Sequence, residues 1–329
     1  MAKKFLIIRF SSIGDIVLTT PVIRCLRKKF PDAGIYYLTK KNFAAIVESN
    51  PYITKVLTLA EDLDDTIDLL KEEKFDAVID LHFNLRTLRI KQALKGVQFY
   101  SYNKLNTQKW IYTNFKLNLL PAKHIVDRYM ETVSAFNVVN DELGLDFFIP
   151  EKDKVKESDI PFSHSHGFLS IAIGAAHFTK KLPVDKLKEL CAKIDYPIIL
   201  LGGKDDFANG SEISGIDPIK IYNACGKYSL NESADIVRRS NLVISHDTGL
   251  MHIAAAFKKM VFSVWGNTVP SFGMYPYKTA CKIFQVSKLW CRPCSKIGYD
   301  RCPLGHFKCM NKIEIDAIVD SVKEFLRKK

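Results

Sequence analysis

Two glycine turns, one in each half of the chain, constrain the fold more than any other feature of this sequence. The first turn, residues 11–15 (SSIGD), follows an apolar run at 5–10, and the second, residues 247–252 (DTGLMH), follows one at 242–245. Each turn opens a helix-like segment, and such units place backbone N–H groups and a carboxylate at the carboxyl edge of a parallel sheet. The pattern predicts two sheet edges facing one another across a cleft, which suits group transfer from a nucleotide-activated donor.

Strand-length apolar runs alternate with helix-length amphipathic stretches in both halves, which predicts an α/β fold with two parallel sheets and right-handed crossovers. The chain has 329 residues, of which 47% are apolar, enough for two cores. Strands are expected at 5–10, 35–38, 55–58, 77–81, 97–100, 168–173, 198–201, 219–222, 242–245 and 260–264. Helices are expected at 16–29, 42–48, 63–73, 85–94, 125–136, 184–193, 230–239, 250–257 and 313–326.

Changes in composition predict the domain boundaries. We expect an N-terminal Rossmann-like domain at 1–150, a charged, aperiodic linker at 151–167, a C-terminal Rossmann-like domain at 168–312 and a terminal helix at 313–329. No run approaches the roughly 18 apolar residues of a membrane span, and the chain begins without a secretory signal pattern. A cytoplasmic protein is therefore expected.

The formal net charge is +12, and the basic residues are concentrated between Arg86 and Arg128. This segment holds nine Lys or Arg against one acid, Asp127, and the aromatic residues Trp110, Tyr112 and Phe115 are interleaved with them. Basic residues mixed with aromatic ones suit a surface that meets lipid headgroups or a phosphorylated glycolipid, and a solvated basic face is the alternative. We therefore expect peripheral contact with the cytoplasmic face of the inner membrane.

Two other classes of protein fit the sequence less well. A nicotinamide-dependent oxidoreductase would show a Gly-x-Gly-x-x-Gly turn after residues 5–10, and none is present. A basic, zinc-stabilised nucleic-acid-binding protein would explain the charge but leaves residues 247–252 unexplained. Neither nucleic acid nor a dinucleotide is therefore an expected partner.

Four motifs occur in an order that resembles the signature of family 9 glycosyltransferases, the lipopolysaccharide heptosyltransferases. The motifs are residues 9–16 (RFSSIGDI) with Thr20-Pro21, residues 180–183 (KKLP), Gly202-Gly203 and residues 247–254 (DTGLMHIA). The resemblance spans nearly the whole chain. It implies a GT-B fold and an inverting, metal-independent transfer of a sugar, typically from ADP-heptose, to a phosphorylated or Kdo-containing inner-core lipid acceptor. Another nucleotide sugar or another lipid-linked glycan acceptor is the alternative within the family.

Asp15 is the candidate general base. An inverting transfer needs one group to take the proton from the acceptor hydroxyl. Asp15 lies at a helix start, where the dipole keeps a carboxylate ionised, and the family's catalytic acid falls at the matching position. The alternative is that Asp15 only caps the helix.

Lys180 is the candidate cation for the leaving diphosphate, helped by the backbone N–H groups at Thr248 and Gly249. The family usually has an aromatic residue where this chain has Leu182, so Lys181 remains a second candidate.

The resemblance also implies residues for the nucleoside and the sugar. Asp206 is expected to accept hydrogen bonds from the ribose hydroxyls, and its neighbour Asp205 is the substitute. Asp247 is expected to cap the following helix and reach a sugar hydroxyl. His252 is expected near the phosphates, with a buried core histidine as the alternative. No cofactor is expected besides the ADP-sugar substrate.

Four cysteines lie within 19 residues near the C-terminus, with His306 among them. They are Cys291, Cys294, Cys302 and Cys309. Clustered thiols in a cytosolic chain are compatible with a structural zinc site, and reduced structural thiols or a disulfide are the other interpretations.

Overall fold

The computed structural model describes residues 3–328, which form two compact units. The first unit comprises residues 3–105 and Lys123–Pro150, and the second comprises Asn106–Ala122 and residues 151–328. Asn106–Ala122 was expected in the N-terminal domain but belongs to the second unit. Its side chains find their partners there, since the Lys116 ammonium donates to the Pro293 carbonyl at 2.9 Å and the Tyr112 ring contacts the Phe272 ring.

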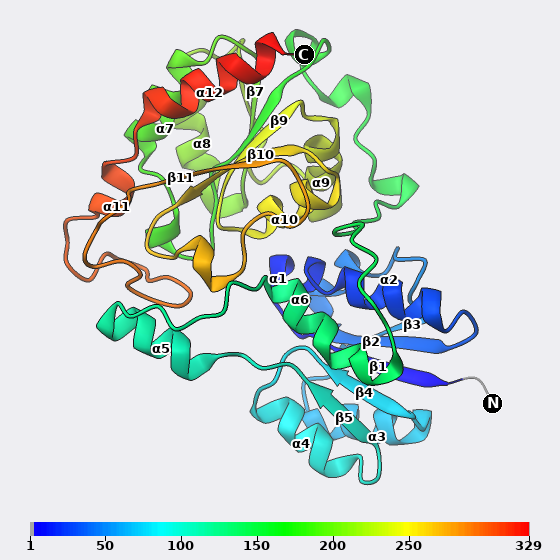
Figure 1. The fold of residues 1–329 in the computed structure, drawn as a ribbon. Coiled ribbons are helices and arrows are strands. Elements are labelled where there is room, and N and C mark those ends of the chain that lie inside the picture. The colour runs from blue at the N-terminus through cyan, green and yellow to red at the C-terminus, as the bar shows by residue number, and fades with distance from the viewer. Residues whose placement is uncertain (1–2, 329) are drawn as a thin grey trace. The chain divides into compact units, whose positions relative to one another are not determined.

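The first unit is built on a parallel sheet with strand order β3-β2-β1-β4-β5 (Figure 1). Its strands are β1 (Lys4–Ile8), β2 (Gly34–Lys40), β3 (Lys55–Leu59), β4 (Ala77–Asp80) and β5 (Gln98–Ser101). Its helical segments are α1 (Ile13–Val17), α2 (Thr20–Lys29), η1 (Lys41–Ile46), α3 (Leu63–Glu73), α4 (Leu85–Ala93), α6 (Ile125–Met130) and η2 (Glu131–Phe136). Helices α3 and α4 cover one face of the sheet, and α2 and α6 cover the other. The central strand β1 is buried on both faces, which explains its unbroken apolar run.

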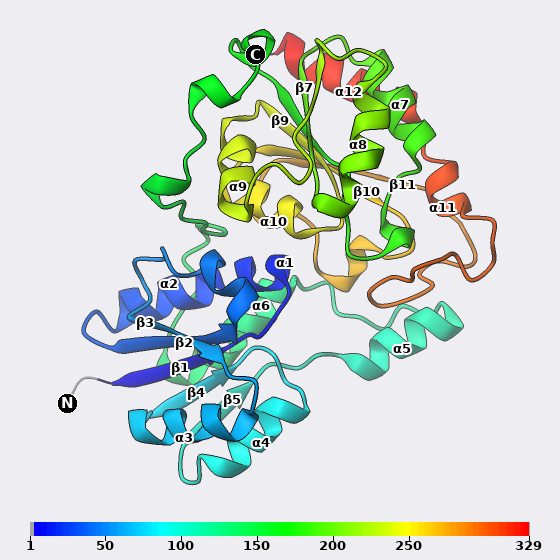
Figure 2. The same cartoon turned by 180° about the vertical axis from the view of Figure 1, so that it is seen from behind.

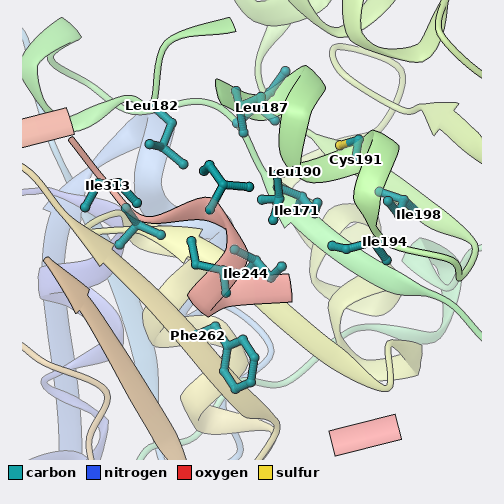
Figure 3. Close-up of a cluster of buried hydrophobic side chains, with 14 of the residues drawn as sticks. Ile171, Leu182, Leu187, Leu190, Cys191, Ile194, Ile198, Ile244, Phe262 and Ile313 are labelled. Carbon is teal, nitrogen blue, oxygen red and sulfur yellow. The ribbon is translucent and has the colours of Figure 1, made fainter. Parts of the chain in front are cut away.

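The second unit contains a six-stranded parallel sheet with order β11-β10-β9-β6-β7-β8 (Figure 2). Its strands are β6 (Leu169–Ala172), β7 (Ile198–Leu201), β8 (Ile221–Asn223), β9 (Leu242–His246), β10 (Met260–Trp265) and β11 (Cys281–Gln285). Its α-helices are α5 (Asn106–Phe115), α7 (Val184–Lys193), α8 (Phe207–Ser214), α9 (Leu230–Arg239), α10 (Gly249–Ala256), α11 (Lys308–Asn311) and α12 (Ile315–Arg327). Figure 3 shows part of its core, where Leu187 and Leu190 of α7 lie near Ile171 of β6.

The predicted α/β class with two parallel sheets is confirmed, and the differences are local. The helix expected at 16–29 is broken into α1 and α2, with Pro21 in the first turn of α2, a position that proline favours because its missing N–H is not needed there. The helix expected at 42–48 is the 3-10 segment η1, and the helix expected at 125–136 continues from α6 into η2. The expected linker holds three 3-10 turns and packs on the second unit, where the Val155 N–H donates to Asp235.

Helices α5 and α8 and strand β11 were not predicted. No side chain of α5 is buried, and in β11 only Phe284 is, so neither segment carries the apolar pattern that reveals a helix or strand. Within residues 3–328, no helix is both long and apolar enough to cross a bilayer.

Candidate active site

Asp15 lies on α1, directly beyond the carboxyl end of the central strand β1. Its Oδ1 forms an ion pair with Arg9 Nη2 at 2.7 Å, and its Oδ2 accepts a hydrogen bond from Ser12 Oγ at 2.7 Å. The Ser12 backbone N–H also points to Oδ2, at 3.3 Å. The side chain remains 20% exposed. Asp15 therefore caps the helix start and still presents its carboxylate to solvent, so capping does not exclude a role as base.

Arg9 forms the ion pair with Asp15, and the Arg9 guanidinium is almost fully buried. Its Nε donates to the Ser11 carbonyl at 2.7 Å, and its Nη1 donates to the Leu81 carbonyl at 2.6 Å and to the Tyr129 hydroxyl at 3.1 Å. Burial acts to lower the pKa of Arg9, but the Asp15 carboxylate together with the Tyr129 and Tyr102 hydroxyls outweighs burial, and the pKa is raised. A charged, fixed guanidinium therefore orients the candidate base.

His82 follows β4 at the same edge of the sheet and was not found from the sequence. Burial and the positive charge of Arg9 lower the pKa of His82 to about 3, so its imidazole is neutral at pH 7. Its ring packs on Phe10 with centroids 4.8 Å apart. A single histidine outside the four motifs gives no sequence signal, and only the fold brings it near Asp15.

Lys180 and Asp247 form an ion pair at the carboxyl edge of the second sheet. Lys180 Nζ lies 2.7 Å from Asp247 Oδ2, and both side chains are mostly buried. The same Oδ2 accepts from Thr268 Oγ1 at 2.9 Å. Thr248 is the N-cap of α10, and the first backbone N–H groups of that helix, from Gly249 on, have no partner within the helix. These groups follow Asp247 closely in the chain. The structure thus brings Lys180, Asp247, Thr248 and Gly249 together, as the motifs predicted.

Lys181 points to a different carboxylate. Its Nζ lies 2.7 Å from Asp206 Oδ1, while Asp206 Oδ2 accepts from the Gly203 N–H at 3.0 Å. A Cβ at Gly174 would lie 2.3 Å from Asp206 Oδ2, so the Asp206 side chain fills a space that only glycine leaves open. Asp206 is thus engaged within the loop that carries it, whereas its neighbour Asp205 is exposed.

Two histidines lie at the ends of the 247–252 turn: His246 directly precedes it, and His252 is its last residue. His252 is 2% exposed within α10, in keeping with the alternative of a buried core histidine. His246 ends β9, and its Nε2 accepts the Leu182 N–H at 2.9 Å. Burial lowers the pKa of His246 to about 4, which keeps this acceptor neutral. His246 was missed from the sequence, although its place directly before Asp247 was a usable signal.

The four clustered cysteines are free thiols, as are the other four. Cys294 Sγ donates to the Cys291 carbonyl at 2.9 Å, and Cys309 is buried in the core of the second unit. Burial raises the pKa of Cys294 to about 12 and that of Cys309 to about 11. Across residues 3–328, no three His, Cys, Asp or Glu side chains are grouped so as to hold a metal ion. The side chains as placed therefore do not fit the predicted zinc site.

The basic segment between Arg86 and Arg128 includes buried and paired residues as well as exposed ones. It is divided between the two units, and Arg128 is 3% exposed. Arg89 pairs with Asp64, and Lys116 is bonded to Pro293. Two of its aromatic residues, Trp110 and Phe115, lie on α5 and are 53% and 67% exposed.

Comparison with known proteins agrees with this architecture. A family model described as glycosyltransferase family 9 (heptosyltransferase) matches residues 66–303. Lipopolysaccharide heptosyltransferase 1 of Campylobacter coli is 25% identical over 293 residues, which cover 82% of this chain and 85% of that protein.

Solved structures share the whole fold. The glycosyl transferase family 9 protein of Veillonella parvula DSM 2008 matches with a TM-score of 0.80 and 20% identity, covering 100% of this chain and 98% of that one. Escherichia coli heptosyltransferase WaaC, solved with ADP, matches with a TM-score of 0.69 and 16% identity, covering 98% and 99%. These likenesses confirm the expected GT-B class. The chain belongs to glycosyltransferase family 9, the heptosyltransferases.

Proposed function

We propose that this protein is an inverting glycosyltransferase that moves heptose from ADP-heptose to a lipopolysaccharide core acceptor. The observation that carries the proposal is the Lys180–Asp247 pair beside the start of α10, 2.7 Å apart and mostly shielded from water. A buried ammonium beside free backbone N–H groups is a ready site for a diphosphate. The names of the relatives supply the sugar and the acceptor class.

The second unit would bind the donor. The Lys180 ammonium and the first N–H groups of α10 would stabilise the charge that develops on ADP as the bond from the anomeric carbon to the phosphate oxygen breaks. Asp247, held by Thr268, would accept a hydrogen bond from a sugar hydroxyl. These groups supply positive charge without a metal ion, so the proposed transfer is metal-independent. His252 would support the phosphate end of the site from within α10.

The ribose contact remains a proposal for Asp206. Its carboxylate already accepts from Lys181 and Gly203, so binding the ribose would require one of these bonds to be shared. Asp205, exposed on the same loop, is the substitute that the sequence suggested.

The first unit would supply the base. Asp15 would take the proton of the acceptor hydroxyl as its oxygen attacks the anomeric carbon on the face opposite the leaving ADP, which inverts the configuration. One bond forms, one breaks, and the proton passes to the carboxylate. The spacing of the clustered cysteines suggested zinc, their side chains as placed do not fit it, and no step of this reaction involves a metal there.

The nucleotide specificity tests the proposal directly. The purified protein should bind ADP and ADP-heptose, measured by isothermal titration calorimetry, and should bind GDP, UDP and dTDP at least tenfold more weakly. Transfer of heptose to a Kdo-containing acceptor lipid should follow. Equal binding of another nucleoside diphosphate would favour the alternative of a family member with a different donor.

The exposed aromatic residues near α5 would meet the lipid surface that carries the acceptor. Trp110 and Phe115 are flanked by basic side chains, which suits the boundary of an anionic bilayer. The double variant Trp110→Ser/Phe115→Ser should adsorb about tenfold more weakly to phosphatidylglycerol vesicles in a flotation assay. Phe162→Ser, which removes an aromatic ring that is 84% exposed elsewhere on the same unit, is the matched control. Equal adsorption of all three proteins would show that the segment is only a solvated face.

A further inference from the structure

The cysteine loop, residues 286–307 between β11 and α11, is attached to the residue that precedes Lys180. The Thr179 N–H and Thr179 Oγ1 both donate to the Tyr299 carbonyl, at 3.1 Å and 3.0 Å. In return, the Tyr299 N–H donates to Thr179 Oγ1 at 2.8 Å. Thr179 is 1% exposed, and its bonds to the more exposed Tyr299 are partly buried. The backbone from which the Lys180 side chain starts is therefore fixed by a loop about 120 residues away in the sequence.

A second attachment of the cysteine loop reaches Asp247 through one intermediate residue. Arg292 Nη2 donates to the Thr268 carbonyl at 2.8 Å, and Arg292 Nη1 donates to the Val286 carbonyl at 2.6 Å. Thr268 in turn donates from Oγ1 to Asp247 Oδ2 at 2.9 Å. Beside this contact, the Cys294 N–H donates to the Asn267 carbonyl at 3.2 Å. The loop therefore holds both partners of the Lys180–Asp247 pair.

Two glycines allow this close approach. Gly298, within the loop, has φ +130°, and a Cβ there would lie 2.6 Å from the His177 side chain. A Cβ at Gly266 would lie 2.7 Å from the Thr179 carbonyl oxygen. Any side chain at either position would push the cysteine loop or the β10 end away from the segment that carries Lys180.

We propose that the cysteine loop positions Lys180 and Asp247 for the donor diphosphate, with Thr179, Tyr299 and Arg292 as positioning residues. The inference rests on the proposed function, because it assigns these contacts to donor binding. A lysine side chain is a flexible chain with a point charge at its end, so its placement depends on a fixed backbone and a fixed counter-charge. The attachment at Thr179 fixes the backbone next to Lys180. The attachment through Arg292 and Thr268 fixes the Asp247 counter-charge.

Substitution of Thr179 separates the hydrogen bond from the packing. Thr179→Val keeps the side-chain shape but leaves the partly buried Tyr299 N–H without its acceptor and removes one of the two donors to the Tyr299 carbonyl, which weakens the attachment. Thr179→Ser keeps the hydroxyl and loses only a methyl group. We expect ADP to bind Thr179→Val about tenfold more weakly and Thr179→Ser within twofold of wild type, by isothermal titration calorimetry. The KM for the donor should rise more than kcat falls.

Arg292→Met provides an independent test if Thr179→Val fails to fold, because it removes the other attachment. Its ADP affinity should fall several-fold, while Lys296→Ala, an exposed change in the same loop, should leave it unchanged. Wild-type ADP affinity in folded Thr179→Val, or in Arg292→Met, would overturn the inference and leave the proposed function intact. An equal loss in Thr179→Ser and Thr179→Val would also overturn it, since packing alone would then explain the effect. Failure of the wild-type protein to bind ADP would instead refute the proposed function.

Discussion

Replacement of Asp15 by asparagine is expected to lower kcat by about a hundredfold or more and to leave the Kd for ADP close to the wild-type value. An asparagine amide has the shape of the carboxylate but cannot take a proton from the acceptor hydroxyl. Asp15 belongs to the first unit, whereas Lys180 and Asp247 belong to the second, so donor binding should not depend on it. Steady-state transfer rates and calorimetric ADP binding measure the two quantities separately.

A companion variant distinguishes the base from the helix cap. Ser12→Ala removes the hydroxyl that donates to Asp15 Oδ2 and keeps the carboxylate and the Arg9 contact. It should reduce the free energy of unfolding by about 1 kcal/mol or less and kcat by less than tenfold. If Asp15→Asn loses no more turnover than Ser12→Ala, Asp15 is only a cap, and the base must be another group.

The parts of the fold that the sequence predicted are those whose pattern is complete within a short segment of the chain. Strands β1 and β9 contain unbroken apolar runs, residues 5–8 and 242–244, because they lie in the middle of their sheets with both faces covered. The glycine turns that follow them are also local signals, because the backbone geometry of a strand–turn–helix unit depends on a few adjacent residues. Asp15 and the Asp247 turn were found for this reason.

The parts that were missed depend on partners far away in the sequence. Helix α5 has no apolar stripe and is assigned to the second unit through contacts such as Lys116 with Pro293. Arg9 stands within a motif, yet nothing in one sequence reveals that its guanidinium is buried between Asp15 and Tyr129. The spacing of the cysteines suggested a metal, whereas the loop that carries them is attached to Thr179.

The sequence left open which of the two adjacent lysines contacts the diphosphate. In the structure they pair with different carboxylates, so we expect the two alanine variants to differ in ADP affinity. Lys180→Ala should weaken ADP binding by at least tenfold and lower kcat by about a hundredfold, because it removes the cation beside the α10 start. Lys181→Ala should change ADP affinity by only a few-fold, because its ammonium faces Asp206 instead.

Stability measurements provide the control for this comparison. Each substitution removes the ion-pair partner of a mostly buried carboxylate, Asp247 at 11% exposure and Asp206 at 9%. Each carboxylate keeps one hydrogen-bond donor, the Thr268 hydroxyl for Asp247 and the Gly203 N–H for Asp206, so Lys180→Ala and Lys181→Ala should unfold at similar urea concentrations. Urea unfolding and calorimetry on both variants decide the assignment. If Lys181→Ala is the variant that loses ADP binding, then Leu182 marks a shifted register, and Lys181 is the lysine at the diphosphate.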